Sequence, residues 1–307
     1  MTMLFTDADV AAGLDAPEAV AAMRAALLAA YEGRLVAPPR AAVPLDGGRL
    51  VFTAGRLDPE WYGYRSYDTF GRPDGEQLVV LHESDTGRIR AIAVGAEIGS
   101  RRTGAIGGVA VDALARPDAD TLAVIGAGGQ AWTQVWAAAA VRPLRQVRVF
   151  SRTATHRDRF AARVRAELGV PVRAVDGAAA AVRDADIVVL ATTSATPVLA
   201  ATDLAPGAHV NAVGFKQAGR AEFGADLLDR AEVLATDSPA QVLGYDPPML
   251  AAAPPYLDRL VPLGAVLAGA APGRTRADEV SLFCSVGLAG TEVFLLDRLA
   301  RANARVG

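Results

Sequence analysis

A strand, a tight turn and a helix follow one another in the segment Thr121-Leu-Ala-Val-Ile-Gly126-Ala-Gly128-Gly-Gln-Ala131. The apolar run at residues 121–126 is typical of a buried strand, and we predict a helix over residues 130–141. A GxGxxG/A pattern indicates dinucleotide binding when it directly follows a strand and opens a helix, which is its position here. The segment therefore predicts the start of a nucleotide-binding domain.

The composition of this turn has a physical explanation. Gly126 permits the tight bend, Gly128 lets the backbone approach a pyrophosphate, and Ala131 allows the helix to pack closely on the strand. Amides at the helix start, around Gly129 and Gln130, are available to phosphate oxygens. We therefore assign these residues to cofactor binding, the alternative being a glycine-rich turn without a ligand.

Strands and helices continue to alternate after this unit. We predict strands over residues 146–151, 170–175, 186–191, 209–214 and 232–237, and helices over residues 156–168 and 177–183. Such alternation favours a parallel sheet with right-handed crossovers. The predicted fold class is α/β, with a doubly wound, NAD(P)-binding Rossmann domain over residues 118–287.

The N-terminal part of the chain has a different pattern. Asp15 and Pro17 mark the start of a helix that ends at Tyr31. Segments of strand character at residues 49–53, 63–69 and 77–82, separated by turn signals, predict antiparallel hairpins. We expect the C-terminal helix, residues 288–304, to pack back onto this part. Residues 1–117 with 288–307 are therefore expected to form a second, α+β domain.

The composition excludes several classes of protein. With 307 residues, 51% of them apolar, the chain is long enough for two domains with well-packed cores. The 31 basic and 34 acidic residues are interleaved and give a net charge of −3, so no basic surface is offered to nucleic acid or to an anionic membrane. No uncharged apolar stretch is long enough to span a bilayer.

Cysteine and histidine are scarce. Cys284 is the only cysteine, so no intramolecular disulfide can form, and His82, His156 and His209 lie far apart. No Cys/His spacing typical of a metal site exists. The first residues lack the basic and apolar regions of a signal peptide. We therefore predict a cytoplasmic protein without a metal.

The cofactor preference is predicted from the end of the second strand of the Rossmann domain. Proteins that select NAD have a carboxylate there, which binds the ribose 2′-hydroxyl. This chain has Ser151, Arg152 and Thr153 instead. An arginine and two hydroxyls can hold a 2′-phosphate, so we predict NADP(H) in preference to NAD(H). The alternative is that Arg152 is an ordinary solvated side chain.

Several further segments, with the glycine-rich turn, make the chain similar to the ornithine cyclodeaminase/mu-crystallin family nearly from end to end. The segments are Gly33 with Pro38-Pro39-Arg40, Arg101-Arg102-Thr103-Gly104-Ala105, Ala185-Asp-Ile-Val-Val-Leu-Ala-Thr-Thr-Ser194, Pro206-Gly-Ala-His-Val-Asn-Ala-Val-Gly214 and Phe283-Cys-Ser-Val-Gly287. The resemblance implies a Rossmann domain joined to a substrate-binding, dimer-forming domain made from the N-terminal part and the C-terminal helix. It also implies a homodimer that uses a nicotinamide cofactor on small amino acids, opine-like adducts or cyclic imines.

The resemblance assigns roles to individual residues. Arg40 and Arg102 match the arginines that hold the substrate carboxylate, a task that suits the guanidinium fork. Arg65 stands where many members have a lysine near the reacting carbon, and we assign it to both substrate binding and catalysis. The cofactor-binding positions that the resemblance implies are Thr103, Thr192, Thr193, Val213, Gly214, Arg220, Ser285 and Gly287.

The largest departure from the family is at Lys216. Ornithine cyclodeaminases have an aspartate at this position that acts on the substrate amine, and an ammonium group there would repel that amine. Lys216 is also the only lysine in the chain. Lysine can donate a proton where arginine cannot, so we assign Lys216 as catalytic, the alternatives being that it binds a phosphate or faces solvent.

These assignments favour an NADPH-dependent reductase of a small, carboxylate-bearing imine. Cyclic ketimines such as pyrroline-2-carboxylate and piperideine-2-carboxylate are the expected substrates, and amino-acid dehydrogenation is a related possibility within the same class. One alternative is a mu-crystallin-like protein that binds NADPH and a small ligand without turnover. The other is an ornithine cyclodeaminase.

Overall fold

The structure is a computed structural model that describes residues 1–72 and 75–304. The chain divides into two compact units, Met1–Arg102 with Gly287–Gly307 (unit 1) and Thr103–Val286 (unit 2). The first division lies inside helix α3 (Glu97–Leu114), whereas the sequence placed it after residue 117. No element was predicted over α3, because its internal glycines lower helix propensity.

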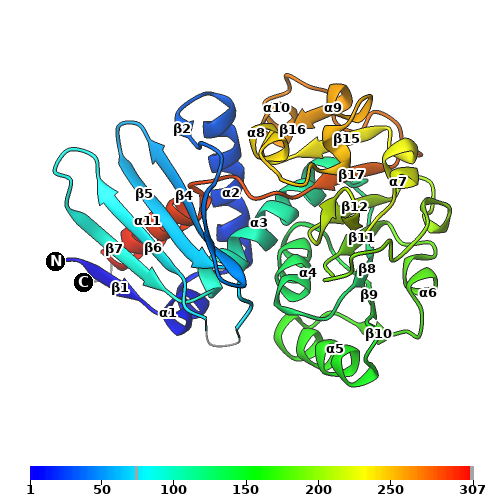
Figure 1. The fold of residues 1–307 in the computed structure, drawn as a ribbon. Helices are drawn as coiled ribbons and strands as arrows, with labels where there is room; N and C mark the ends of the chain where they lie inside the picture. The colour runs from blue at the N-terminus through cyan, green and yellow to red at the C-terminus, as the bar shows by residue number, and fades with distance from the viewer. Residues whose placement is uncertain (73–74, 305–307) are drawn as a thin grey trace. The chain divides into compact units, whose positions relative to one another are not determined.

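Unit 1 is a seven-stranded sheet with helices packed against it (Figure 1). In spatial order the strands are β1 (Met3–Phe5), β7 (Ile89–Val94), β6 (Leu78–Glu83), β5 (Trp61–Asp68), β4 (Gly48–Leu57) and β2 (Leu35–Val36), while β3 (Ala41–Leu45) also pairs with β4. The helices are α1 (Asp7–Gly13), α2 (Ala16–Tyr31) and α11 (Thr291–Asn303). The predicted antiparallel hairpins are confirmed, and α11 packs on α2, β5, β6 and β7, as expected.

Two glycines let α11 approach the sheet closely. Gly55 on β4 and Gly63 on β5 are directly paired in the ladder. A Cβ on Gly55 would lie 2.6 Å from Gly290 Cα, and a Cβ on Gly63 would lie 2.7 Å from Val293 Cγ1. Both distances are shorter than any normal contact, so the missing side chains make the space that the first turn of α11 occupies.

Unit 2 is an eight-stranded parallel sheet with the helices of a doubly wound fold (Figure 1). Its strands are, in spatial order, β10 (Val172–Ala174), β9 (Gln146–Phe150), β8 (Thr121–Ile125), β11 (Ile187–Leu190), β12 (His209–Ala212), β17 (Ser281–Cys284), β15 (Val233–Thr236) and β16 (Leu260–Pro262). Its helices are α4 (Gly129–Val141), α5 (Ala154–Leu168), α6 (Ala178–Val182), α7 (Ala225–Arg230), α8 (Pro239–Leu243), α9 (Tyr256–Arg259) and α10 (Leu263–Leu267). A small hairpin is formed by β13 (Lys216–Gln217) and β14 (Arg220–Ala221). The predicted doubly wound parallel sheet is confirmed.

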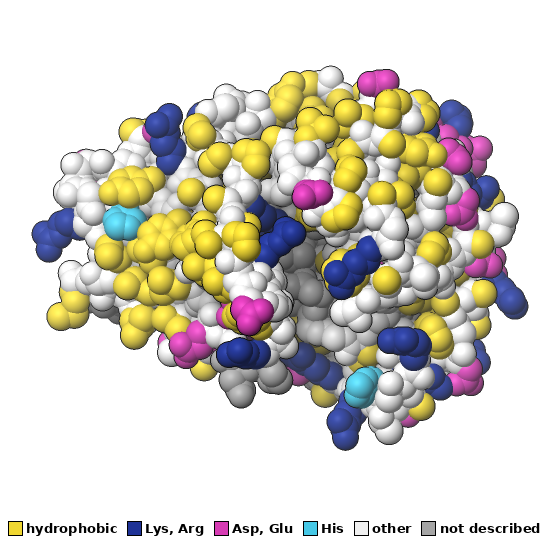
Figure 2. All heavy atoms as spheres, viewed as in Figure 1, with side chains coloured by type: hydrophobic (Ala, Val, Ile, Leu, Met, Phe, Trp, Pro, Cys, Tyr) yellow, Lys and Arg dark blue, Asp and Glu magenta, His cyan; other side chains and the backbone are white. Residues whose placement is uncertain are grey.

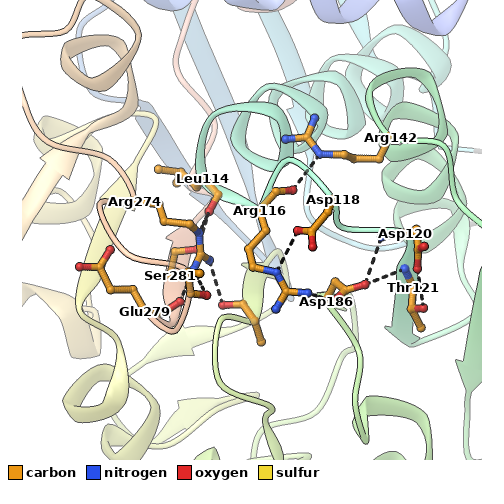
Figure 3. Close-up of polar contacts among 12 residues, drawn as sticks. Leu114, Arg116, Asp118, Asp120, Thr121, Arg142, Asp186, Arg274, Glu279 and Ser281 are labelled. Atoms are coloured by element: carbon orange, nitrogen blue, oxygen red, sulfur yellow. Dashed lines mark hydrogen bonds and ion pairs between the residues drawn. The ribbon is translucent and has the colours of Figure 1, made fainter.

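A half-buried polar cluster connects the starts of strands at the amino edge of this sheet (Figure 3). Asp186 accepts hydrogen bonds from the amides of Asp120 at 3.1 Å and Thr121 at 3.0 Å, and it pairs with Arg116 at 2.5 Å. Beside it, Arg274 donates to Leu114 O at 2.8 Å. Because these charged groups are satisfied by protein partners, we assign them to the structure of the sheet.

Candidate functional site

The glycine-rich turn lies where β8 ends and α4 begins. Gly126 has a φ of +118°, which side chains other than glycine rarely adopt, and a Cβ there would collide with the carbonyl oxygen of Ala191. Its amide donates to Phe150 O at 2.9 Å, which joins the turn to the end of β9. Ala131 is fully buried. The fold itself therefore requires glycine at position 126 and a small side chain at 131.

Around Gly128 and Gly129, unlike Gly126, the structure leaves open space where a side chain would lie. Gly128 is the N-cap of α4 in extended backbone, and no atom lies within 4 Å of a Cβ built on either glycine. The first amides of a helix lack intrahelical partners and carry the positive end of its dipole. Next to them, Gln130 Oε1 is buried without a hydrogen-bond partner among the described residues. The open space and the amides at the helix start fit the pyrophosphate of a nicotinamide dinucleotide.

Most of the predicted cofactor residues of unit 2 follow the carboxyl ends of β9, β8, β11, β12 and β17, which are neighbours in the sheet. This edge is where open α/β sheets bind ligands. In strand order, these residues are Ser151, Arg152 and Thr153; Gly126, Gly128, Gly129, Gln130 and Ala131; Thr192 and Thr193; Val213 and Gly214; and Ser285. The structure thus brings together positions that are widely separated in the sequence.

Three predicted cofactor positions lie elsewhere. Thr103 is in α3, where its carbonyl accepts a hydrogen bond from Gln134 Nε2 at 3.0 Å. Arg220 is exposed on β14, with its guanidinium carbon 3.7 Å from the ring centre of Phe215. Gly287 falls in unit 1. Their assignment to the cofactor stays a prediction.

The segment after β9 is held by Arg157, to which no motif in the sequence pointed. Arg157 Nη1 donates to Ser151 O at 3.1 Å, and the same guanidinium pairs with Asp176. Arg152 and Thr153 are exposed in this segment. Arg157 therefore fixes the backbone at Ser151 while the side chain of Arg152 extends into solvent, where a ligand can reach it.

Lys216 is buried and bound to the loop that follows β12. Its Nζ donates to Val213 O at 3.0 Å and to Gly214 O at 2.6 Å, and the residue is 5% exposed. The alternative that Lys216 faces solvent is therefore wrong. An ammonium group bound to two carbonyls of this loop fixes the loop, and it stands among the predicted cofactor positions.

Glu222 joins the ends of the neighbouring strands β11 and β12 at the same place, and no local pattern pointed to it. Glu222 Oε2 accepts from Thr192 N at 2.9 Å and from Thr192 Oγ1 at 2.8 Å, and its Oε1 accepts from Gly214 N at 2.5 Å. Burial raises the pKa of Glu222, and the charge of Lys216 opposes this shift. Lys216 and Glu222 together therefore shape the loops after β11 and β12.

In unit 1, Arg40 and Arg102 meet at Gly287. A Cβ built on Gly287 would lie 2.6 Å from both Arg40 Nη2 and Arg102 Nη1, so the two guanidiniums converge on one point. Arg40 Nη2 also donates to Gly287 O at 3.3 Å. Arg102 is 5% exposed. Two arginines that converge in this way can bind a carboxylate.

The third predicted arginine, Arg65, lies in a buried ionic cluster with Arg102. Both pair with one carboxylate, Glu292, at 2.5 Å and 2.6 Å respectively. Arg65 Nε also donates to Gln77 Oε1 at 3.1 Å, and the guanidinium carbon lies 4.3 Å from the ring centre of Tyr67. Burial lowers the pKa of Arg65, the negative charge of Glu292 opposes this, and the positive charge of Arg102 adds to it. Because Glu292 and Gln77 hold its guanidinium, Arg65 is a fixed cation rather than a mobile proton donor.

Among the described residues, no group of acidic, histidine or cysteine side chains is arranged to hold a metal ion. The helices within the described ranges are also too short or too polar to cross a membrane.

Residues 1–304 match the ornithine cyclodeaminase/mu-crystallin family. The chain belongs to this family. The chain is 32% identical over 222 residues to a Delta(1)-pyrroline-2-carboxylate reductase of Bacillus cereus. The matched region covers 71% of this chain and 68% of the relative.

Solved structures of the family are similar over the whole chain. Delta(1)-pyrroline-2-carboxylate reductase of Thermococcus litoralis, solved with NADH and L-proline, has a TM-score of 0.90 at 27% identity and covers 99% of this chain and 98% of its own. An archaeal alanine dehydrogenase, solved as a dimer with bound NAD, has a TM-score of 0.88 at 25% identity, with coverage of 99% and 96%.

Proposed function

We propose that this family member is an NADPH-dependent reductase of a small imine that bears a carboxylate. Cyclic ketimines such as pyrroline-2-carboxylate and piperideine-2-carboxylate are the favoured substrates, and dehydrogenation of the corresponding amino acids is the related reaction. The class, an NAD(P)-dependent oxidoreductase acting on C=N or CH–NH groups, is supported by the named relatives. The observation that carries the proposal is the convergence of Arg40 and the buried Arg102 in a chain that also has a glycine-rich turn of the dinucleotide-binding type.

In this proposal Arg40 and Arg102 hold the substrate carboxylate. Their guanidiniums present two sets of N–H donors near Gly287. A held carboxylate fixes the position of the adjacent C=N carbon, and orientation of this kind supplies much of the rate in a reaction whose chemistry belongs to the cofactor.

A bound NADPH would supply the hydride. The amides at Gly128 and Gly129 would hold its pyrophosphate, and Arg152 with the hydroxyls of Ser151 and Thr153 would hold the 2′-phosphate. The T. litoralis relative was solved with NADH. Selection of NADPH is therefore a property to be tested on this chain, by comparing the rise in Tm with NADPH and with NADH in the native protein and in Arg152→Ala.

We propose Lys216 as the residue that donates a proton or hydrogen bond to the substrate nitrogen. Its Nζ is fixed by the carbonyls of Val213 and Gly214, and Glu222 accepts a hydrogen bond from Gly214 N of the same loop. Arg65 contributes a fixed positive charge near the substrate. Lys216→Gln should lower kcat and change its pH profile, while Lys216→Arg, which keeps the charge, should lower kcat with little effect on NADPH binding.

The partner proposed is a second copy of the same chain, with no nucleic acid or membrane partner. The archaeal alanine dehydrogenase is a dimer, and unit 1 has an exposed apolar sheet face that suits such a contact. A cytoplasmic location is proposed from composition, since the single cysteine, Cys284, is a buried thiol.

The deciding experiment follows NADPH oxidation by absorbance with three substrates offered separately: pyrroline-2-carboxylate, piperideine-2-carboxylate, and pyruvate with ammonia. We expect fast turnover of at least one cyclic ketimine. Turnover of pyruvate with ammonia alone would support an amino-acid dehydrogenase. No turnover of any substrate by a protein that binds NADPH would overturn the proposal and favour the mu-crystallin-like binding function.

A further inference from the structure

We infer that Glu292 is the positioning residue of the carboxylate-binding arginines. The inference rests on the proposed function in one respect, that Arg40 and Arg102 hold an anionic substrate. Glu292 does not bind the substrate itself. It acts through Arg102 and Arg65, whose guanidiniums it holds in place within unit 1.

A single oxygen of Glu292 bridges the two arginines. Glu292 Oε1 accepts from Arg65 Nη1 at 2.5 Å and from Arg102 Nε at 2.8 Å, and Arg102 Nη2 lies 2.6 Å from the same oxygen. Charge-assisted hydrogen bonds of this length are strong and directional. Arg65 and Arg102 repel each other, so without the carboxylate between them they would separate.

The contacts fix which side of Arg102 is turned toward the ligand. Glu292 binds the edge formed by Nε and Nη2. The remaining nitrogen, Nη1, is thereby directed to Gly287, where Arg40 Nη2 also lies. Glu292 thus prepares the meeting of Arg40 and Arg102 before any substrate binds, which reduces the ordering cost of binding.

Glu292 also sets the charge of the cluster. Its side chain is 1% exposed, and although burial raises the pKa of this carboxyl, Arg102 and Arg65 hold it down at about 2. Glu292 is therefore ionised at neutral pH. The cluster has a net charge of +2, from Arg40, Arg65 and Arg102 together with Glu292. This net charge attracts an anion, and Glu292 neutralises one of the three positive charges.

Glycines before α11 and on the neighbouring strands determine where Glu292 lies. Glu292 is in the first turn of α11, after Gly290, whose φ is +77°. This turn occupies the space left by Gly55 and Gly63, which are paired on β4 and β5. Arg65 stands two residues after Gly63 and so points to the same face of the sheet. The close approach of α11 therefore brings the carboxylate under the guanidinium.

The test compares Glu292→Gln and Glu292→Asp with Asp297→Asn as a matched control. Asp297 is a buried carboxylate of the same helix that pairs with Arg90 and Arg301, outside the cluster. With pyrroline-2-carboxylate, we expect Glu292→Gln to raise KM at least tenfold and to change kcat less than threefold. Glu292→Asp, which keeps the charge on a side chain shorter by one methylene, should raise KM by a smaller factor, about threefold, and Asp297→Asn should leave KM unchanged.

A KM that stays native in Glu292→Gln, or that rises equally in Asp297→Asn, overturns the inference. If Glu292→Gln does not fold, the same comparison of KM and kcat is made with Glu292→Asp, which must then show a raised KM. An unaltered KM in that variant counts against a positioning role.

A second readout remains if the native protein reduces no imine. Sulfate is the probe, and the measurement is the rise in Tm with sulfate at matched ionic strength. Without Glu292 the guanidinium of Arg102 is no longer held beside Arg40, so Glu292→Gln should show less than half of the native rise in Tm, and Asp297→Asn should show the native rise. A native response in Glu292→Gln, or an equal loss in Asp297→Asn, overturns the inference whatever the substrate is.

Discussion

Arg101 and Arg102 are adjacent in sequence and similarly buried, but they are bound to different partners. Arg101 donates to Glu97 at 2.7 Å and to Leu14 O at 2.6 Å, while Arg102 is bound to Glu292 and lies against Gly287. Arg102→Ala should therefore raise KM for the carboxylate substrate, with a loss in kcat/KM equivalent to about 2–5 kcal/mol. Steady-state kinetics of NADPH oxidation measures this.

Arg101→Ala is the control for that prediction, because it removes an equally buried arginine from the same helix turn. It should lower the free energy of unfolding and leave KM near the native value. Equal rises of KM in the two variants would mean that the helix, and not the guanidinium of Arg102, determines substrate affinity.

His209 makes stability depend on pH. It is fully buried between Ser281 Oγ at 2.9 Å and Asn211 Oδ1 at 2.8 Å, and Asn211 Nδ2 donates to Gln134 Oε1 at 3.1 Å. This pattern assigns the proton to His209 Nε2. Burial lowers the pKa of His209 to about 3, below its ordinary value of 6.5, so the unfolded chain takes up a proton first as pH falls.

The sign of the effect follows from these two pKa values. The contribution of His209 is fully present above about pH 6.5 and is lost progressively as pH falls toward 3. Urea unfolding at pH 7 and pH 4.5 should show a larger loss of stability in the native protein than in His209→Gln, which cannot titrate. Equal losses in both proteins would show that other groups control the acid response.

At the scale of elements, the turn between β8 and α4 contains one glycine that the fold requires and one that we expect cofactor binding to require. A side chain at Gly126 meets Ala191 O and an unfavourable φ, whereas a side chain at Gly128 meets no atom within 4 Å. Gly128→Ala should therefore change the free energy of unfolding by less than about 1 kcal/mol and raise the Kd for NADPH at least tenfold. Gly126→Ala should lower stability directly. Normal NADPH binding by a folded Gly128→Ala protein would contradict the assignment of this space to a phosphate.

The sequence predicted elements whose signal is local. The apolar strands of unit 2 and the capped helix α2, where Asp15 accepts from Glu18 N at 2.8 Å, were found because their patterns lie within a few residues. The helix α3 was missed because Gly104 and Gly107 look unfavourable in isolation. Cβ atoms on these glycines would collide with Thr133 and Gln134 of α4, so close packing of the two helices is the reason for them.

Outside the glycine-rich turn and the segment after β9, the candidate site was predictable only where a family pattern named it. Arg40, Arg65 and Arg102 were assigned by resemblance, but their partner Glu292 is separated from Arg102 by 190 residues, and no periodicity in one sequence connects them. Glu222 was missed for the same reason, since its partner Thr192 lies 30 residues earlier on another strand end. Pairings made by tertiary structure leave no trace in a local pattern.

At the scale of the whole molecule, unit 1 has an apolar face that the single chain leaves open. Phe52, Tyr62 and Tyr64 are 38%, 40% and 36% exposed on neighbouring strands β4 and β5, and Val43 on β3 is 51% exposed. Tyr62 stacks on His82 with ring centres 4.8 Å apart. Figure 2 shows hydrophobic side chains gathered over these strands. Contiguous exposed apolar surface of this kind marks an interaction site.

The proposed homodimer can be tested on this face. The native protein should sediment with a mass near twice the 31.8 kDa of one chain, and a variant with Phe52→Glu and Tyr64→Glu should sediment as the single chain, because two buried carboxylates per protomer oppose the contact. Leu243→Glu, which places the same charge on an exposed leucine of unit 2, is the control and should leave the dimer intact. A dimer that survives both sheet substitutions would assign the contact to another surface of the chain, and a native protein that sediments as one chain would exclude the homodimer.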